Sequence, residues 1–137
     1  YRGTGFVISQ QVTTSCAQVS DLSVTMPEDV GPGSTIVVTV TVGTGIYHTS
    51  GECDFLELFI SRFPDNCDQY PGYFMTNVAT NLPTSYYYST STIQRAFYYD
   101  VGFTGGEAFY VNAKMSMGCD SSDHLMTGNT VAVYYPD

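Results

Sequence analysis

The sequence predicts an all-β fold, an antiparallel β-sandwich that forms a single domain over residues 1–137. Residues typical of strands and turns, namely Thr, Ser, Gly, Val and Tyr, dominate the composition. Apolar and polar residues alternate with a period of two in several segments, and none of these segments has helical periodicity. Clusters of Gly, Pro, Asn and Asp separate the segments, which predicts about nine or ten strands joined by turns.

The first half of the chain contains four of the expected strands. Residues 5–12 begin apolar and end polar, and residues 22–26 alternate. Residues 34–42 (STIVVTVTV) have the clearest alternation in the chain, which is typical of a half-buried strand. The next strand is expected at residues 53–61, after a loop at residues 43–51 whose Thr-Gly and Ser-Gly pairs break the pattern.

Shorter apolar segments in the second half predict further strands, with turn-rich segments between them. These strands are expected at residues 74–79, 86–88, 92–99, 108–117 and 130–135. The segments 1–15 and 126–137 carry terminal strands that are expected to lie outside the core, where they pair with each other or extend the sheets.

The segment CDFLELFI, within residues 53–61, is central to the functional predictions. Because side chains alternate along a strand, Leu56, Leu58 and Ile60 are expected to face the core, on the same side as Asp54. Both faces of this strand are fairly apolar, which favours a place in the middle of a sheet. Asp54 opens the strand, and its carboxylate is expected to stay near solvent.

The charge balance of the chain is strongly acidic. Four basic residues stand against 13 acidic residues, which gives a formal net charge of −9. Such a surface repels phosphate groups, so we expect neither nucleic acid nor an anionic membrane as a partner. Cations, basic proteins and neutral glycans are compatible with it, and the acidity also serves to keep a secreted protein soluble.

Four cysteines, Cys16, Cys53, Cys67 and Cys119, predict two disulfides. None of them forms a Cys-x-x-Cys pair, and the chain has only two histidines, which argues against a zinc site. An even number of cysteines in a small chain indicates an oxidising compartment, so the protein is expected to be the mature form of a secreted, extracellular protein without membrane insertion. The sequence allows three pairings, of which we expect Cys53–Cys67, closing a hairpin-sized loop, with Cys16–Cys119, tying the ends of the core.

Three segments resemble the CUB domain, the extracellular β-sandwich of complement proteases, developmental proteases and spermadhesins. Residues 27–42 resemble its proline-led turn and alternating strand, and CDFLEL at residues 53–58 resembles its signature of cysteine, aspartate, an aromatic residue and glutamate. Residues 92–113 resemble the closing pattern, in which a strand ends in Asp, a Gly-rich turn follows and a Phe enters the last strand. The resemblance covers roughly residues 20–119 and implies a CUB-like jelly roll with additional N- and C-terminal strands.

The resemblance also implies a calcium ion, because many CUB domains hold one with carboxylates at one end of the sandwich. Asp54 and Asp100 match two of the family's ligand positions. Glu52 and Glu107 are the substitutes for a third acidic ligand that this chain lacks at the expected place. Calcium requires about six to eight oxygen ligands, some of which neighbouring loops would supply. The alternative is that both aspartates accept hydrogen bonds from backbone N–H groups and cap turns.

The chain offers little for catalysis, because it has no Gly-x-Ser-x-Gly motif and only two histidines for a triad. We therefore predict a non-enzymatic module that binds an extracellular protein or glycan. Its expected contacts are exposed tyrosines and acidic loop residues, namely Tyr87, Tyr99, Asp120 and Asp123. A second hypothesis is a structural subunit of an extracellular filament or coat, a homo-oligomer or fibre formed by exchange of a terminal strand. A hydrolase is a minor third, which would require a buried carboxylate pair or a triad built on a histidine.

Overall fold

The computed structural model describes nine strands and no helix within residues 2–3, 10–26, 28, 33–68, 73–78, 80–98, 106–115 and 124–135. In chain order the strands are β1 (Arg2–Gly3), β2 (Gln10–Gln11), β3 (Ala17–Thr25), β4 (Thr35–His48), β5 (Asp54–Ser61), β6 (Tyr73–Val78), β7 (Ser85–Tyr98), β8 (Ala108–Met115) and β9 (His124–Tyr135). The predicted all-β class is confirmed. Within this described part of the chain, no helix is long and apolar enough to cross a membrane.

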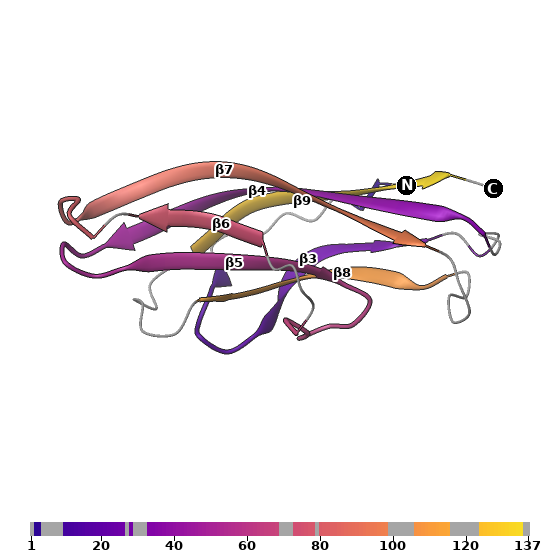
Figure 1. The fold of residues 1–137 in the computed structure, drawn as a ribbon, viewed down its shortest axis with the longest axis horizontal. Coiled ribbons are helices and arrows are strands. Elements are labelled where there is room, and N and C mark those ends of the chain that lie inside the picture. The colour runs from indigo at the N-terminus through magenta and orange to yellow at the C-terminus, as the bar shows by residue number, and fades with distance from the viewer. Residues whose placement is uncertain are drawn as a thin grey trace.

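The strands form two antiparallel sheets, which Figure 1 shows as two layers. The five-stranded sheet has the order β1-β9-β4-β7, and β2 also pairs with β9. The four-stranded sheet has the order β3-β8-β5-β6, so β5 lies in the middle of its sheet, as predicted. We call the side of a sheet that is turned away from the other sheet its outward face.

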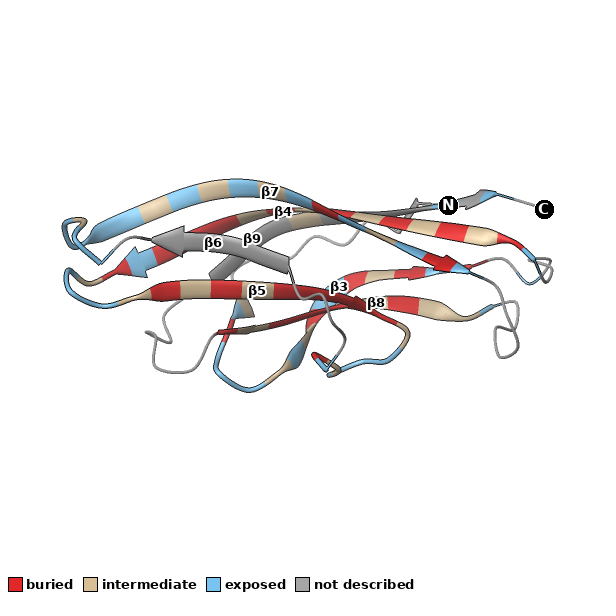
Figure 2. Cartoon of the chain, viewed as in Figure 1, coloured by how far each residue is buried: buried red, intermediate tan, exposed pale blue. Residues whose placement is uncertain are grey.

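The core lies between the sheets and is built from alternate residues of the long strands. On β4, Val38 and Val40 are fully buried while the neighbouring threonines are half-buried, as the sequence alternation predicts. On β5, Leu56, Leu58 and Ile60 are buried, which confirms the predicted core face. Figure 2 shows buried or half-buried residues alternating with exposed residues along β7. Residues of both sheets belong to one buried apolar cluster, the core expected of a β-sandwich.

Four strands are longer than the sequence predicts, namely β3, β4, β7 and β9. The glycines of residues 43–51 predict a loop, but β4 runs through Gly43 and Gly45 to His48. The neighbouring strands explain the difference, because β4 pairs with β7 on one side and with β9 on the other, so ladder hydrogen bonds hold both glycines. Similarly, β7 is one continuous strand over the two separate segments that the sequence predicts.

The terminal strands take part in the body of the fold. β9 pairs with β4 on one side and with β1 and β2 on the other. Val12 is 4% exposed and belongs to the core cluster. A Cβ atom at Gly128 of β9 would lie 2.7 Å from Cδ1 of the buried Leu22 in β3, so the two strands approach too closely for a side chain there. In the described residues, β1 therefore pairs with the C-terminal strand, as predicted, whereas Val12 belongs to the core and Gly128 packs against it, instead of both lying outside it.

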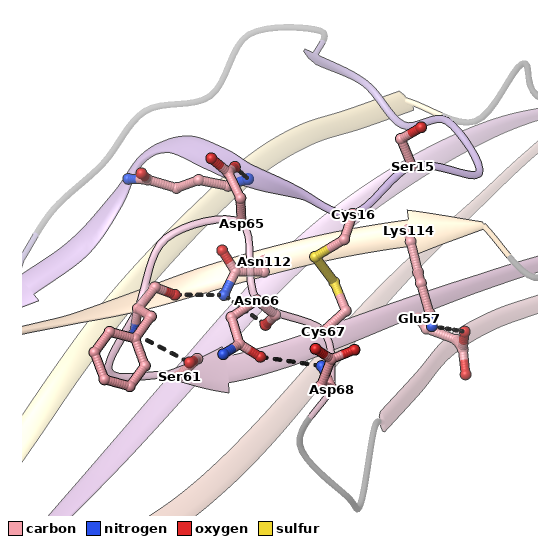
Figure 3. The surroundings of a disulfide bond; sticks show 12 residues. Ser15, Cys16, Glu57, Ser61, Asp65, Asn66, Cys67, Asp68, Asn112 and Lys114 are labelled. Atoms are coloured by element: carbon pink, nitrogen blue, oxygen red, sulfur yellow. Dashed lines mark hydrogen bonds and ion pairs between the residues drawn. A yellow bond between two sulfur atoms is a disulfide. The ribbon is translucent and has the colours of Figure 1, made fainter.

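A disulfide joins Cys16, which precedes β3, to Cys67, which follows β5 (Figure 3). The expected pairings Cys53–Cys67 and Cys16–Cys119 are therefore wrong. Cys53 is disulfide-bonded as well, while Cys119 lies outside the described residues. The reason lies in the strand order: β3 and β5 both pair with β8 at Ala113, which brings the start of β3 close to β5, whereas the whole length of β5 separates Cys53 from the loop that carries Cys67.

Asn112 of β8 holds the loop that follows β5. This residue is fully buried, and its Nδ2 donates hydrogen bonds to the backbone oxygens of Phe63 and Asn66, both at 3.0 Å. Oδ1 of Asp65 accepts a hydrogen bond from the backbone N–H of Gln18 at 2.7 Å, which ties the same loop to β3. The loop therefore folds back over β8 and delivers its cysteine to the start of β3 (Figure 3).

Candidate functional site

The end of β4 and the start of β7 lie side by side and divide their side chains between two faces. Tyr47 pairs with Tyr86, and Tyr88 follows two residues later on the same strand, so the three tyrosines share the outward face of the five-stranded sheet. Their exposed fractions are 39%, 58% and 68%. His48 and Tyr87, which alternate with them, face the interior; His48 is fully buried and Tyr87 is half-buried.

The three outward rings form one group, which we call the tyrosine platform (Tyr47, Tyr86 and Tyr88). The ring centroids of Tyr47 and Tyr86 are 5.0 Å apart with an interplanar angle of 60°, an edge contact. The rings of Tyr86 and Tyr88 are 6.3 Å apart and nearly parallel, at 15°. Both arrangements are favourable for aromatic pairs. Each ring is therefore supported by a neighbour, while Tyr86 and Tyr88 stay largely open to solvent.

The remainder of this outward face on β4 and β7 is mostly polar and uncharged. The hydroxyl oxygens of Thr41 and Thr92 share a hydrogen bond at 2.9 Å, and Nε2 of Gln94 donates one to Oγ1 of Thr39 at 3.0 Å. The outward positions of the two strands carry no acidic or basic side chain: Thr35, Val37, Thr39, Thr41, Gly43, Gly45, Tyr47, Tyr86, Tyr88, Thr90, Thr92, Gln94, Ala96 and Tyr98. The face is thus electrically neutral on a chain whose net charge is −9.

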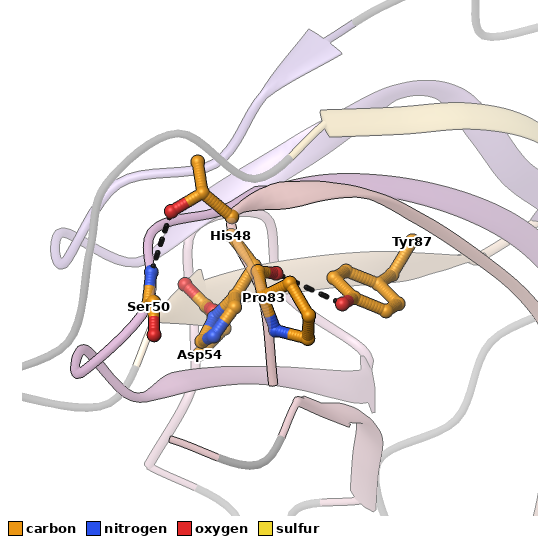
Figure 4. A network of polar contacts seen from close by, with 6 residues as sticks. His48, Ser50, Asp54, Pro83 and Tyr87 are labelled. Atoms are coloured by element: carbon orange, nitrogen blue, oxygen red, sulfur yellow. Dashed lines mark hydrogen bonds and ion pairs between the residues drawn. The ribbon is translucent and has the colours of Figure 1, made fainter. Parts of the chain in front are cut away.

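Behind the tyrosine platform, a buried polar contact joins the two sheets. Nδ1 of His48 on β4 and Oδ2 of Asp54 on β5 are in direct hydrogen-bond contact, and both side chains are 0% exposed. The ring of Tyr87 packs edge-on against the imidazole at a centroid distance of 5.8 Å, and its hydroxyl donates a hydrogen bond to the backbone oxygen of Pro83 at 2.9 Å (Figure 4). The His–Asp pair therefore fastens the sheets together directly beneath the platform.

The burial of Asp54 corrects the prediction that its carboxylate lies near solvent. Because β4 continues to His48, the turn into β5 places the imidazole against the carboxylate and closes the site. A carboxylate at Nδ1 of a histidine also occurs in serine hydrolases, where Nε2 acts as a general base. Here Nε2 of His48 and Oδ1 of Asp54 are both buried and have no hydrogen-bond partner among the described residues, so neither atom is placed to meet a substrate.

The structure does not bring together the described members of the predicted calcium ligand set. Asp54 is enclosed, and Glu52 is exposed in the turn before β5. Glu107 accepts hydrogen bonds from Arg62 at 3.1 and 2.7 Å just beyond the opposite end of β5. At about 3.3 Å per strand residue, that end lies roughly 25 Å from Asp54. Asp100 lies outside the described residues, and within the described part of the chain no three His, Cys, Asp or Glu side chains are grouped to hold a metal ion.

The predicted binding tyrosine faces the wrong way for a surface contact. Tyr87 is half-buried against His48, and the exposed rings are those on either side of it. Ile93 and Phe97 are buried on the same side of β7 as Tyr87. A single alternation extended back from these two apolar residues would predict Tyr87 on the inward face of the strand. The other predicted binding residues lie outside the described part of the chain: Tyr99, Asp120 and Asp123.

Fold and surface together define an all-β, disulfide-bonded protein with an uncharged, aromatic sheet face. Neither a protein-family model nor a curated protein sequence matches the chain. Membership of the CUB family therefore stays a prediction that rests on three sequence segments.

Proposed function

We propose that this protein is a secreted, non-enzymatic binding module that recognises a neutral glycan through the tyrosine platform. The observation that carries the proposal is the outward face of β4 and β7, which presents exposed tyrosines and no charged residue. A sugar ring has an apolar face of C–H groups and a rim of hydroxyl groups, so it packs on an aromatic ring and exchanges hydrogen bonds with hydroxyl and amide groups beside it. The platform and the adjacent Thr and Gln side chains offer both kinds of contact.

The charge distribution supports a neutral ligand over a charged one. The chain carries 13 acidic residues, which would attract a basic protein partner, but none of them stands on the outward face of β4 or β7. A neutral glycan requires no opposing charge and no desolvation of an ionised group on this face. Secretion is part of the proposal because the Cys16–Cys67 disulfide is typical of an oxidising compartment.

Binding to neutral polysaccharides tests the proposal. The wild-type chain is incubated with chitin, cellulose, mannan and β-glucan, and the affinity for soluble oligosaccharides of the best polymer is measured by calorimetry. Replacing Tyr86 and Tyr88 together by serine is expected to weaken binding at least tenfold, because exposed aromatic side chains supply most of the affinity at such surfaces. Phe63→Ser is the matched control, since Phe63 is 55% exposed on the loop after β5; its affinity should equal that of the wild type.

Three outcomes contradict the proposal. The first is that the wild type binds none of the neutral polysaccharides, and the second is that the platform variant binds as tightly as the control. The third is that a protein binds the wild type but not the platform variant, which would show that the platform binds a protein instead of a glycan. Calcium, which the resemblance to CUB domains implies, is tested by repeating the measurements with a chelator and with millimolar calcium; an unchanged affinity and melting temperature would exclude a role for the ion.

An alternative proposal is that the chain is a structural subunit that assembles by exchange of a terminal strand. It is supported by the place of β1 and β2 beside β9 at the edge of the five-stranded sheet, where a strand from a neighbouring copy could replace them. Light scattering over a range of concentrations tests it. Polymers that disappear when residues 1–9 are removed would favour assembly, whereas a monomer at every concentration would exclude it.

A further inference from the structure

We propose that the ligand is a linear, neutral polysaccharide in an extended conformation, which lies along β7 and β4 and contacts aromatic side chains at both ends of the sheet face. This inference rests on the proposed function and names its ligand class. The second contact would be the distal aromatic cluster, which we define as Tyr98, Val133 and Tyr135.

The distal aromatic cluster is built across three neighbouring strands. Tyr98 of β7 and Tyr135 of β9 pair with Thr35 of β4 from opposite sides, so their side chains stand on the same face on either side of it. Val133 lies two residues before Tyr135 and therefore faces the same way. The exposed fractions of Tyr98, Tyr135 and Val133 are 73%, 54% and 41%, which leaves a second aromatic and apolar area open to solvent.

The two aromatic areas belong to one continuous face. β4 and β7 pair from Thr35–Tyr98 to His48–Ser85 without a register shift, so the side-chain alternation never changes face between them. Ten residue steps separate Tyr88 from Tyr98, which corresponds to about 34 Å along an antiparallel strand. Figure 1 shows β7 as a long, gently curved strand over this distance, a shape that an extended chain can follow.

The middle of the face is suited to hydroxyl groups and carries no aromatic ring on β4 or β7. The cross-strand hydrogen bonds between Thr41 and Thr92 and between Thr39 and Gln94 fix these side chains before a ligand arrives. Side chains that are already ordered lose little conformational entropy on binding. A threonine hydroxyl can donate one hydrogen bond and accept two, so the hydroxyls of Thr39, Thr41 and Thr92 can also hydrogen-bond to sugar hydroxyls between the two aromatic areas.

Such a surface would distinguish polysaccharides by the length of the sugar chain. A trisaccharide, whose extended length is shorter than the separation, can contact one aromatic area at a time. A chain that spans both makes the second contact within the same complex, so its affinity gains from the high effective concentration. The absence of charge on the face favours a glycan over an ionic partner. The placement of the two aromatic areas along one strand direction favours a polymer over a compact sugar.

The test measures affinity against chain length for the sugar that the wild type binds best, using oligosaccharides of defined length and the polymer. We expect a rise of at least a hundredfold once the chain spans both areas, well beyond the proportional increase due to additional binding positions. Replacing Tyr98 and Tyr135 together by serine should remove this rise and leave trisaccharide binding by the platform within about twofold of wild type. Phe63→Ser is again the control, and circular dichroism confirms that each variant is folded.

The outcomes separate this inference from the proposed function. If the Tyr86/Tyr88 variant loses binding while the Tyr98/Tyr135 variant keeps full affinity for long chains, the glycan function stands and the extended-polymer inference is overturned. An affinity that rises only in proportion to the number of sugar units overturns it as well. If no neutral glycan binds, both fail, and self-association or a protein ligand that depends on the same tyrosines would identify a different occupant.

Discussion

Replacing Asp54 by leucine tests how much the buried His–Asp pair stabilises the contact between the sheets. Leucine branches at the same atom as aspartate and is somewhat larger, so the substitution removes the carboxylate without leaving a cavity. His48 then loses the acceptor at its Nδ1 while its Nε2 already has no hydrogen-bond partner among the described residues. The imidazole is left polar, enclosed and unsatisfied.

The expected cost follows from the complete burial of both side chains, which are 0% exposed. Removing one member of a buried hydrogen-bonded pair typically lowers the free energy of unfolding by about 1–3 kcal/mol, because the remaining group keeps its desolvation penalty and loses its partner. For a domain of this size, 1 kcal/mol corresponds to about 3–5 °C in melting temperature, so the midpoint should fall by about 3–15 °C.

The assay is urea unfolding under non-reducing conditions, with coincident transitions by two probes as the check on two-state behaviour. His48→Leu, Asp54→Leu and the double variant complete a double-mutant cycle. The double variant should be clearly more stable than Asp54→Leu alone, because two apolar side chains in place of a buried pair are often neutral or stabilising. The coupling free energy between the two positions is then large.

Glu52→Ala is the matched control, because this acidic side chain is exposed two residues before Asp54. Its free energy of unfolding should stay within about 0.5 kcal/mol of wild type. A loss below 1 kcal/mol in Asp54→Leu, or single losses that simply add in the double variant, would refute the reasoning and show that the pair does not hold the sheets together.

Three further predictions concern the fold. Serine at both Cys16 and Cys67 opens a disulfide that spans 51 positions, and loop entropy predicts a loss of about 4 kcal/mol in urea unfolding; an unchanged midpoint would contradict a role in stability. Gly128→Ala forces a methyl group against Leu22 and should cost about 1–3 kcal/mol, which Leu22→Val in the same chain should partly restore; an equally stable Gly128→Ala protein would disprove the close approach. Thr92→Val removes one exposed hydroxyl and should change the melting temperature by less than about 2 °C, yet it should weaken binding of the long oligosaccharide, and equal affinity would exclude this hydroxyl from the contact.

Much of the fold could be predicted because strand formation leaves a local mark. The alternation of valine and threonine in β4 and the burial of Leu56, Leu58 and Ile60 on β5 both follow from a period of two. The error in the length of β4 has a clear cause, since glycines that are poor strand formers alone become ordered when ladders flank them. Gly43 and Gly45 lie in β4 for this reason.

The candidate site was harder to predict because its members meet only through pairing. The sequence indicates that some tyrosines of residues 86–88 face outward, but which ones do so depends on β7 being one strand in register with β4. The sequence therefore predicts Tyr87 at the surface, whereas it packs on His48 beneath the platform. Likewise, the sequence predicts Asp54 near solvent because residues 43–51 read as a loop, whereas β4 runs on to His48 and brings its imidazole onto the carboxylate six residues later.

The sequence by itself determined the all-β class, the central place of β5, the core face of that strand and the strongly acidic, cysteine-containing character of the chain. Only the tertiary structure decided the partner of Cys16, the enclosure of Asp54 by His48 and the gathering of tyrosines on an uncharged face. The physical reason is that periodicity and composition are properties of neighbouring residues. The contacts that make the site depend on strand length, strand order and register, which pairing with other strands decides.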